Sequence, residues 1–214
     1  MSDRYRFVGP LCDFAAMIFS AGQIDKCKTA MHDHIKPGDK VLFAGVGQGA
    51  DVIAAAERGA RVTVVDISRT RVDIFSQRIS ERQFLHPVRQ IHMDIFKFEE
   101  YGNFDMVCIN FFLNVFSRVV VLPLLEHLTR LAREDGYVAI SDFAPPSGRP
   151  IAGIIQSAYW YVADLFLIIF ANNALHPIYD YQDMLEGLGL TIEEVKYCRV
   201  LFDNRYYAIL AKRH

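Results

Sequence analysis

The chain has 214 residues, a length typical of one domain, and 52% of its residues are hydrophobic while 22% are charged. This composition supports a sizeable buried core and excludes a largely disordered chain. Lysine and arginine total 23 against 25 acidic residues, so no field of one sign covers the surface, and we expect no nucleic-acid partner. The four cysteines are far apart without a CxxC pair and the first residues do not resemble a signal peptide, which predicts a cytoplasmic protein with reduced thiols.

Short apolar runs alternate with longer helical stretches along most of the chain. Residues 11–35 predict two helices broken near Gly22 before the first strand. The expected strands are 41–46, 61–66, 88–94, 104–110 and 137–143. The expected helices between them are 51–59, 68–83 and 119–133. This alternation indicates an α/β fold in which helices cover a largely parallel sheet.

The C-terminal part departs from the simple alternation. The turn Glu134-Asp135-Gly136 is expected to precede the strand at 137–143. A short helix is expected at 180–189, and two strands, 191–200 and 205–213, are expected to form a hairpin about a turn at Asp203-Asn204. The sheet therefore ends with an antiparallel pair.

The segment from 151 to 170 is apolar and rich in aromatic residues, and it is about long enough to cross a bilayer. Asp164 and Gln156 lie within it, and an acid near the centre of a spanning helix costs about 2.5–3.5 kcal/mol. We therefore favour a helix enclosed by protein. Ordinary core, an aromatic lid over an apolar acceptor, a homodimer interface and peripheral membrane contact all remain open for this segment.

A glycine-rich turn stands where the first strand passes into its helix. Gly45, Gly47 and Gly49 allow the backbone to approach a ligand where a β-carbon would collide. Asp66 ends the second strand, where its carboxylate can accept hydrogen bonds from ribose hydroxyls. Both features fit a nucleoside cofactor, and they suit a dinucleotide as well as S-adenosylmethionine (SAM). Asp66 could alternatively cap the helix that begins near Ser68.

The end of the third strand favours SAM over a dinucleotide. Met93-Asp94-Ile95 places an acid beside apolar residues at the neighbouring strand tip, where an adenine amino group and ring would lie. Asn110 ends the fourth strand and faces either the methionine part or the acceptor, with a packed loop as the alternative.

Four features together resemble the class I SAM-dependent methyltransferases over nearly the whole chain: VLFAGVGQG at 41–49, Asp66, HMDI at 92–95 and the final hairpin. The resemblance implies a Rossmann-like, seven-stranded sheet of order 3-2-1-4-5-7-6, with strand 7 antiparallel and helices on both faces. It also implies that SAM binds the chain and leaves as S-adenosylhomocysteine (SAH). The implied cofactor-binding residues are Gly45, Val46, Gly47, Gln48, Gly49, Asp66, Ile67, Asp94, Ile95 and Asn110.

Within this family the chain is similar to the ubiquinone and menaquinone C-methyltransferases, through FFLNV at 111–115 and SDFAPP at 141–146. Two positions depart from the family pattern. Phe43 replaces the acid of the first strand, and Glu134-Asp135-Gly136 replaces a Pro-Gly-Gly turn. The likeness therefore implies the cofactor but does not specify a quinone as acceptor.

Methyl transfer from a sulfonium is an in-line displacement, so alignment and exclusion of water supply much of the rate. A general base is needed only if the acceptor must lose a proton. The candidate residues for that role lie where the fold opens toward substrate: Tyr5, Asp142, His176 and Tyr179. His32 and His34 lie two residues apart, with no third ligand at a suitable spacing, so we expect surface or capping histidines and no metal.

The sequence thus predicts a single methyltransferase domain over 1–214, with a helical lid segment at 1–36 and an apolar substrate-side insertion at 147–178. The expected reaction is SAM-dependent methyl transfer to a small, fairly apolar molecule that is quinol-like, aromatic or lipid-like. Two alternatives share the glycine turn: a nucleotide-dependent oxidoreductase and a non-catalytic SAM-binding protein on the same fold. The acceptor atom is left open, because pocket shape carries no motif.

Overall fold

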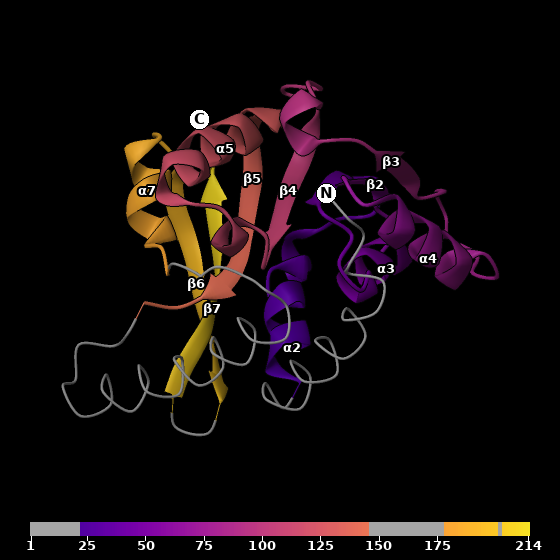
Figure 1. Cartoon of the computed structure of the whole chain (residues 1–214), viewed down its shortest axis with the longest axis horizontal. Helices are drawn as coiled ribbons and strands as arrows, with labels where there is room; N and C mark the ends of the chain where they lie inside the picture. Colours follow the sequence, from indigo (N-terminus) through magenta and orange to yellow (C-terminus); the bar gives the residue numbers. More distant parts are fainter. Residues whose placement is uncertain (1–21, 146–177, 201–202) are drawn as a thin grey trace.

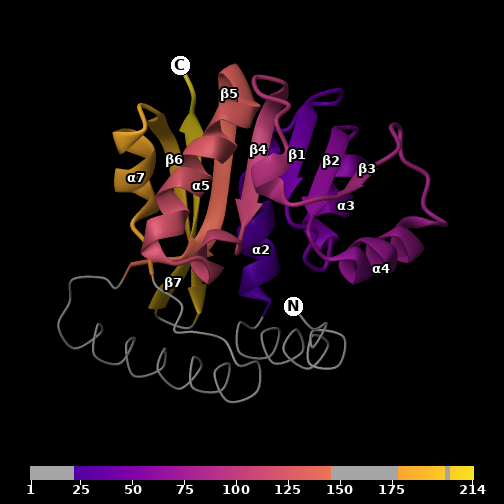
Figure 2. The ribbon, with the colours of Figure 1, turned by 45° about the horizontal axis from the view of Figure 1, so that its top comes forward.

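The computed structural model describes residues 22–145, 178–200 and 203–214. Seven strands form one sheet of order β3-β2-β1-β4-β5-β7-β6 (Figures 1 and 2). Neighbouring strands are parallel from β3 through to β5, whereas β7 runs antiparallel to both β5 and β6. The strands are β1 (Lys40–Ala44), β2 (Arg61–Asp66), β3 (Arg89–His92), β4 (Phe104–Asn110), β5 (Ala132–Phe143), β6 (Thr191–Val200) and β7 (Asp203–Lys212). The expected fold class and strand order are confirmed.

Helices cover both faces of the sheet. The α-helices are α2 (Gln23–Thr29), α3 (Ala50–Glu57), α4 (Arg69–Ile79), α5 (Arg118–Leu131) and α7 (Tyr181–Gly187). Three short 3₁₀ turns accompany them: η1 (His32–His34), η2 (Ile95–Lys97) and η3 (Leu113–Val115). One apolar cluster joins the sheet to α5 and α7, and the other joins it to α2, α3 and α4. In Figure 1 these two groups of helices lie toward opposite sides of the view.

The first strand shows why its sequence is apolar at nearly every position. Leu42 and Ala44 belong to the cluster beneath α5, whereas Val41 and Phe43 belong to the cluster beneath α2 and α3. Successive side chains of a strand point to opposite faces, so a strand covered on both sides must be apolar throughout. The replacement of the family's acid by Phe43 therefore puts a fully buried ring at this position.

Two expected turns lie inside strands. Residues 133–136 bulge from β5, because Phe104 pairs with Ala132 while Met106 pairs with Tyr137. The backbone groups of this bulge bond to the C-terminal segment: Asp135 N–H donates to the Arg213 carbonyl, and Arg213 N–H donates to the Gly136 carbonyl. Asp203 and Asn204 likewise belong to β7, with Asp203 paired to Val200. The antiparallel pairing extends through residues whose types alone indicate turns.

Several expected regions lie outside the described residues, including 1–21, 146–177 and 201–202. Tyr5, His176 and the apolar segment at 151–170 fall in these ranges, so the expected lid and insertion stay predictions. Among helices of the described ranges, none combines the length and the apolar character needed to cross a membrane.

Candidate cofactor site at the carboxyl edge of the sheet

The glycine turn between β1 and α3 has a backbone that other residues rarely adopt. Gly45, Gly47 and Gly49 have φ angles of +85°, +51° and +73°. A β-carbon on Gly49 would lie 2.3 Å from the ring of Phe75, and one on Gly45 would lie 3.3 Å from the ring of Phe112. A β-carbon on Gly47 would meet no atom within 4 Å, so the turn is open at its centre. The backbone of this loop can be approached closely by a ligand.

Val46 and Gln48 contribute to the turn in different ways. The Val46 side chain is buried in the core, while its backbone N–H donates to Asp66 Oδ2 at 2.9 Å. Gln48 is exposed, and its carbonyl oxygen accepts a hydrogen bond from Arg78. The turn is therefore held to both β2 and α4 by polar contacts.

Asp66 ends β2 beside this turn and is half-buried. Its Oδ1 accepts from Ser68 N–H at 2.8 Å and its Oδ2 accepts from Val46 N–H. Ser68 itself caps α4 by accepting from Arg71 N–H. An ionised carboxylate has about four lone-pair sites, so two remain after these contacts. The residues present therefore fit a ligand with paired hydroxyl groups such as a ribose.

The side chain that follows Asp66 provides apolar surface. Ile67 is 70% exposed, unlike the strand residues before it. Asp94 follows β3 and accepts from Phe96 N–H at 3.1 Å, capping η2. Ile95 is buried in the core on the α5 side, where its carbonyl oxygen lies 2.9 Å from His127 Nε2. Of the two isoleucines expected to bind the cofactor, the structure exposes Ile67 and buries Ile95, the one expected near the adenine.

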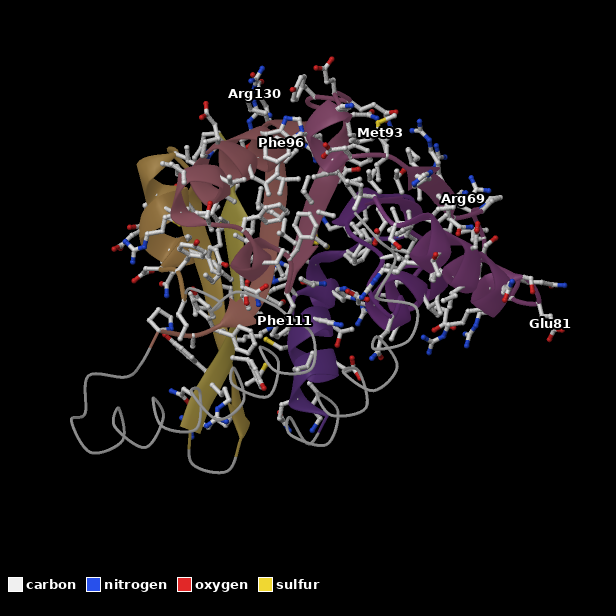
Figure 3. The ribbon with its side chains drawn as sticks, in the orientation of Figure 1. Arg69, Glu81, Met93, Phe96, Phe111 and Arg130 are labelled. Carbon is white, nitrogen blue, oxygen red and sulfur yellow. The ribbon has the colours of Figure 1, made fainter. Side chains whose placement is uncertain are left out.

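Asn110 ends β4 and connects two helices to the strand tip. Its Nδ2 donates to Asp51 Oδ2 at 2.8 Å and to the Lys28 carbonyl at 3.3 Å. Phe111, the next residue, has a positive φ of 49° and lies near α2, with its ring centre 6.0 Å from Lys28 Nζ (Figure 3). Sequence reasoning missed Asp51, because an acid in the first turn of a helix is common and carries no specific signal.

Asp142, near the end of β5, is 1% exposed, and several donors fill the acceptor positions of its carboxylate. It accepts from Tyr181 Oη at 2.8 Å, from Asn114 Nδ2 at 3.1 Å and from Phe143 N–H at 2.8 Å, and the Asn114 backbone N–H also contributes. Burial raises its pKa to about 7 despite these donors. The carboxylate joins β5 to η3 and α7 rather than facing solvent.

Tyr179, another expected candidate for a general base, is also committed to the fold. It is buried, and its hydroxyl donates to the Phe116 carbonyl oxygen at 2.7 Å. Burial raises the pKa of this phenol. Its carbonyl oxygen in turn accepts from the Tyr207 hydroxyl at 3.0 Å. In the structure Tyr179 thus connects the loop that precedes α5 to β7.

Solved structures share this architecture. The N1-methyltransferase of 1,6-didemethyltoxoflavin from Burkholderia thailandensis, crystallised with that molecule and SAH, superposes with a TM-score of 0.65 at 19% identity, over 100% of this chain and 91% of that one. Residues 41–136, which span β1 to the bulge of β5, match the family model described as a methyltransferase domain. Residues 41–136 thus carry a methyltransferase domain, and the fold is the one that these solved methyltransferases share. The expectation of a methyltransferase is confirmed.

Curated relatives also match parts of the chain. The ribosomal protein L11 methyltransferase of Desulfitobacterium hafniense is 26% identical over 110 residues, which are 51% of this chain and 33% of that protein. The mitochondrial ribosomal RNA small subunit methyltransferase of Arabidopsis thaliana is 30% identical over 86 residues, 40% of this chain and 22% of that protein. The chain thus spans a third or less of the length of these relatives. Their names cover a protein and an RNA acceptor, so the family match does not identify the acceptor here.

Proposed function

We propose that the chain binds SAM at the carboxyl edge of the sheet and transfers its methyl group to a small, fairly apolar molecule. One observation carries the cofactor assignment. The glycine turn and Asp66 are joined by the 2.9 Å hydrogen bond from Val46 N–H, which leaves an open turn centre beside a carboxylate with unused acceptor capacity. The SAH-bound neighbour and the matched methyltransferase domain support the same assignment.

The residues of the turn and of the strand tips would divide the cofactor between them. Gly47 offers open space and backbone groups to the methionine part, and Asp66 offers its free lone pairs to the ribose hydroxyls. Ile67 presents an exposed apolar side chain to one face of the adenine, with Asp94 near its amino group. When bound, SAM supplies a methyl group on a positively charged sulfur, and SAH is the product.

The contribution of the protein to rate would be mainly positioning. Asp142 and Tyr179 are buried and bonded within the fold, so we assign them to holding the β4 and β5 tips in place. Should the acceptor have to lose a proton, Tyr5 and His176 are the remaining candidates for a base. An apolar acceptor is supported by the aromatic composition of 151–170, a segment that would also serve for dimerisation or membrane contact.

Titration calorimetry of the purified protein with SAH tests the cofactor. We expect binding, and we expect Asp66→Asn to weaken it about 10–100-fold, because hydrogen bonds to a charged group contribute about 1.5–3 kcal/mol. Asp73→Asn is the matched control, since Asp73 is an exposed acid on the neighbouring helix paired only with Arg69. Binding of NAD(P)H without binding of SAM or SAH would refute the proposal.

Labelled methyl transfer tests the acceptor. The protein is incubated with methyl-labelled SAM and separate panels of quinols, phenols, lipids, ribosomal protein and ribosomal RNA. Label in the small apolar panels is the expected result. Label only in protein or RNA would contradict the acceptor class, and SAH binding with no transfer to any panel would favour a non-catalytic SAM-binding protein.

A further inference from the structure

Asp51 is a buried carboxylate with no cationic partner among the described residues. It lies two residues after Gly49, in the first turn of α3, and is 7% exposed. Its side chain makes one hydrogen bond in the described part of the chain, which it accepts from Asn110 Nδ2 at 2.8 Å. Burying a charge is costly unless it is paired, and the amino end of a helix offsets about 1 kcal/mol or less at an ordinary site. Within the described ranges this carboxylate therefore has no counterion.

The titratable neighbour of Asp51 does not supply that counterion. His32 was expected at the surface, but it is 2% exposed, and its ring packs edge-on against Phe43. Burial lowers its pKa to about 4, although the charge of Asp51 acts in the opposite direction. The imidazole is thus neutral near pH 7. Neither of its ring nitrogens has a hydrogen-bond partner in the described ranges.

The position of Asp51 is defined by the same elements that form the candidate site. Asn110 holds the carboxylate at the β4 tip and is itself tied to the Lys28 carbonyl of α2. The Lys28 ammonium group lies over Phe111 at that tip, 6.0 Å from the ring centre. A carboxylate on α3 and an ammonium group on α2 are thus both placed at the tip of β4, the first through Asn110 and the second over Phe111. This pair of charges complements a zwitterionic amino acid.

We propose that Asp51 receives the α-ammonium group of the methionine part of SAM, and that Asn110 positions Asp51 for this contact. The inference rests on the proposed function, and it assigns the counterion role to a residue outside the glycine turn itself. Lys28 would face the α-carboxylate of the same amino acid. The cofactor would then supply the positive charge that the described residues do not offer to Asp51.

A thermodynamic cycle isolates the contact. Calorimetry compares SAH with its deaminated analogue, which lacks only the amino group, on the wild type and on Asp51→Asn. The substitution keeps an acceptor for Asn110 and removes the charge. We expect it to weaken SAH about 10–100-fold and to leave the deaminated analogue unchanged, because a charge-assisted hydrogen bond is worth about 1.5–3 kcal/mol. Glu57→Gln, an exposed acid on the same helix, should change neither affinity.

The outcomes separate this inference from the function on which it rests. An equal loss for both ligands, or no loss for either, would overturn the role of Asp51. Failure of the wild type to bind SAH would instead refute the SAM assignment. If Asp51→Asn does not fold, as judged by thermal unfolding, Asn110→Ala replaces it. That variant should weaken SAH more than the deaminated analogue, and an equal effect on both would again overturn the contact.

Discussion

Asp66 and Asp142 stand at the ends of two parallel strands of one sheet, and their surroundings differ sharply. Asp66 is half-buried, accepts two N–H groups from the described backbone and has capacity left for a ligand. Asp142 is enclosed and accepts from a tyrosine, an asparagine and the backbone. The same residue type at equivalent places thus keeps acceptor capacity for a ligand on the β2 side and cross-links elements of the fold on the β5 side. A strand-end acid must be interpreted through its donors and its exposure.

Removing the buried acid should have the largest effect on stability. In Asp142→Ala the Tyr181 hydroxyl and the Asn114 amide lose their common acceptor inside the core. Each unsatisfied buried group costs about 1–3 kcal/mol, so we expect the free energy of unfolding in urea to fall by about 4 kcal/mol. Asp183→Ala, at an exposed acid of α7, should change it by less than about 1 kcal/mol. A small effect at Asp142 would remove the distinction between the two acids.

The second-largest effect should be a dependence of the free energy of unfolding on pH that is due to Asp142. Its folded pKa of about 7 lies above an unfolded value of about 3.9, so the folded state binds more protons between these limits. Its contribution is therefore fully present below about pH 4 and is lost as the pH rises through 7. From pH 5 to 7 we expect the stability of the wild type, measured against Asp142→Asn, to fall by about 2 kcal/mol.

The difference between the wild type and Asp142→Asn cancels the other titrating acids. Contacts with Arg133 and His34 lower the pKa values of Asp105 and Glu194, respectively. The contribution of these two acids to stability is therefore lost as the pH falls, which is opposite to the trend expected for Asp142. Both are unchanged in the variant. If the difference in free energy of unfolding between the wild type and Asp142→Asn is constant between pH 5 and 7, the pKa of Asp142 is not raised in the folded state.

Substitutions in the glycine turn should give the smallest of these effects on stability. Gly49→Ala and Gly47→Ala both place a side chain at a positive φ, but only the first drives a β-carbon into Phe75. Overpacking costs about 1–3 kcal/mol, so we expect Gly49→Ala to lower the free energy of unfolding by about 2 kcal/mol more than Gly47→Ala. Gly47→Ala should instead reduce SAH affinity. Equal effects of both substitutions on stability and on binding would show that the turn has no open centre.

Local sequence patterns predicted most elements of the sheet and its helices, because strands covered on both faces and helices between them leave clear periodicities. β2 and β4 have the expected boundaries, whereas the bulge at 133–136 and the start of β7 do not. In both places, pairing with a distant or antiparallel segment overrides residues that favour turns. The strand order followed from the family resemblance and not from the periodicities.

The site was only partly predictable. Gly45, Gly47, Gly49 and Asp66 follow from spacing, since they lie near one another along a strand and a turn. The contact between Asp51 and Asn110 joins residues 59 apart, and the contact between Asp142 and Tyr181 joins residues 39 apart. Such pairings depend on how α3 and α7 pack against the sheet, so the burial of His32 and Asp142 could not be read from their neighbours.

The hydrogen bond between Val46 and Asp66 has a kinetic consequence. It fixes the loop after β1 against the end of β2 before any ligand arrives, so little backbone freedom remains to be lost at the moment of association. A nucleoside encountering this edge meets a rigid receptor, and the encounter need not wait for the loop to order. The rate at which SAM replaces SAH would then be limited by the dissociation of SAH.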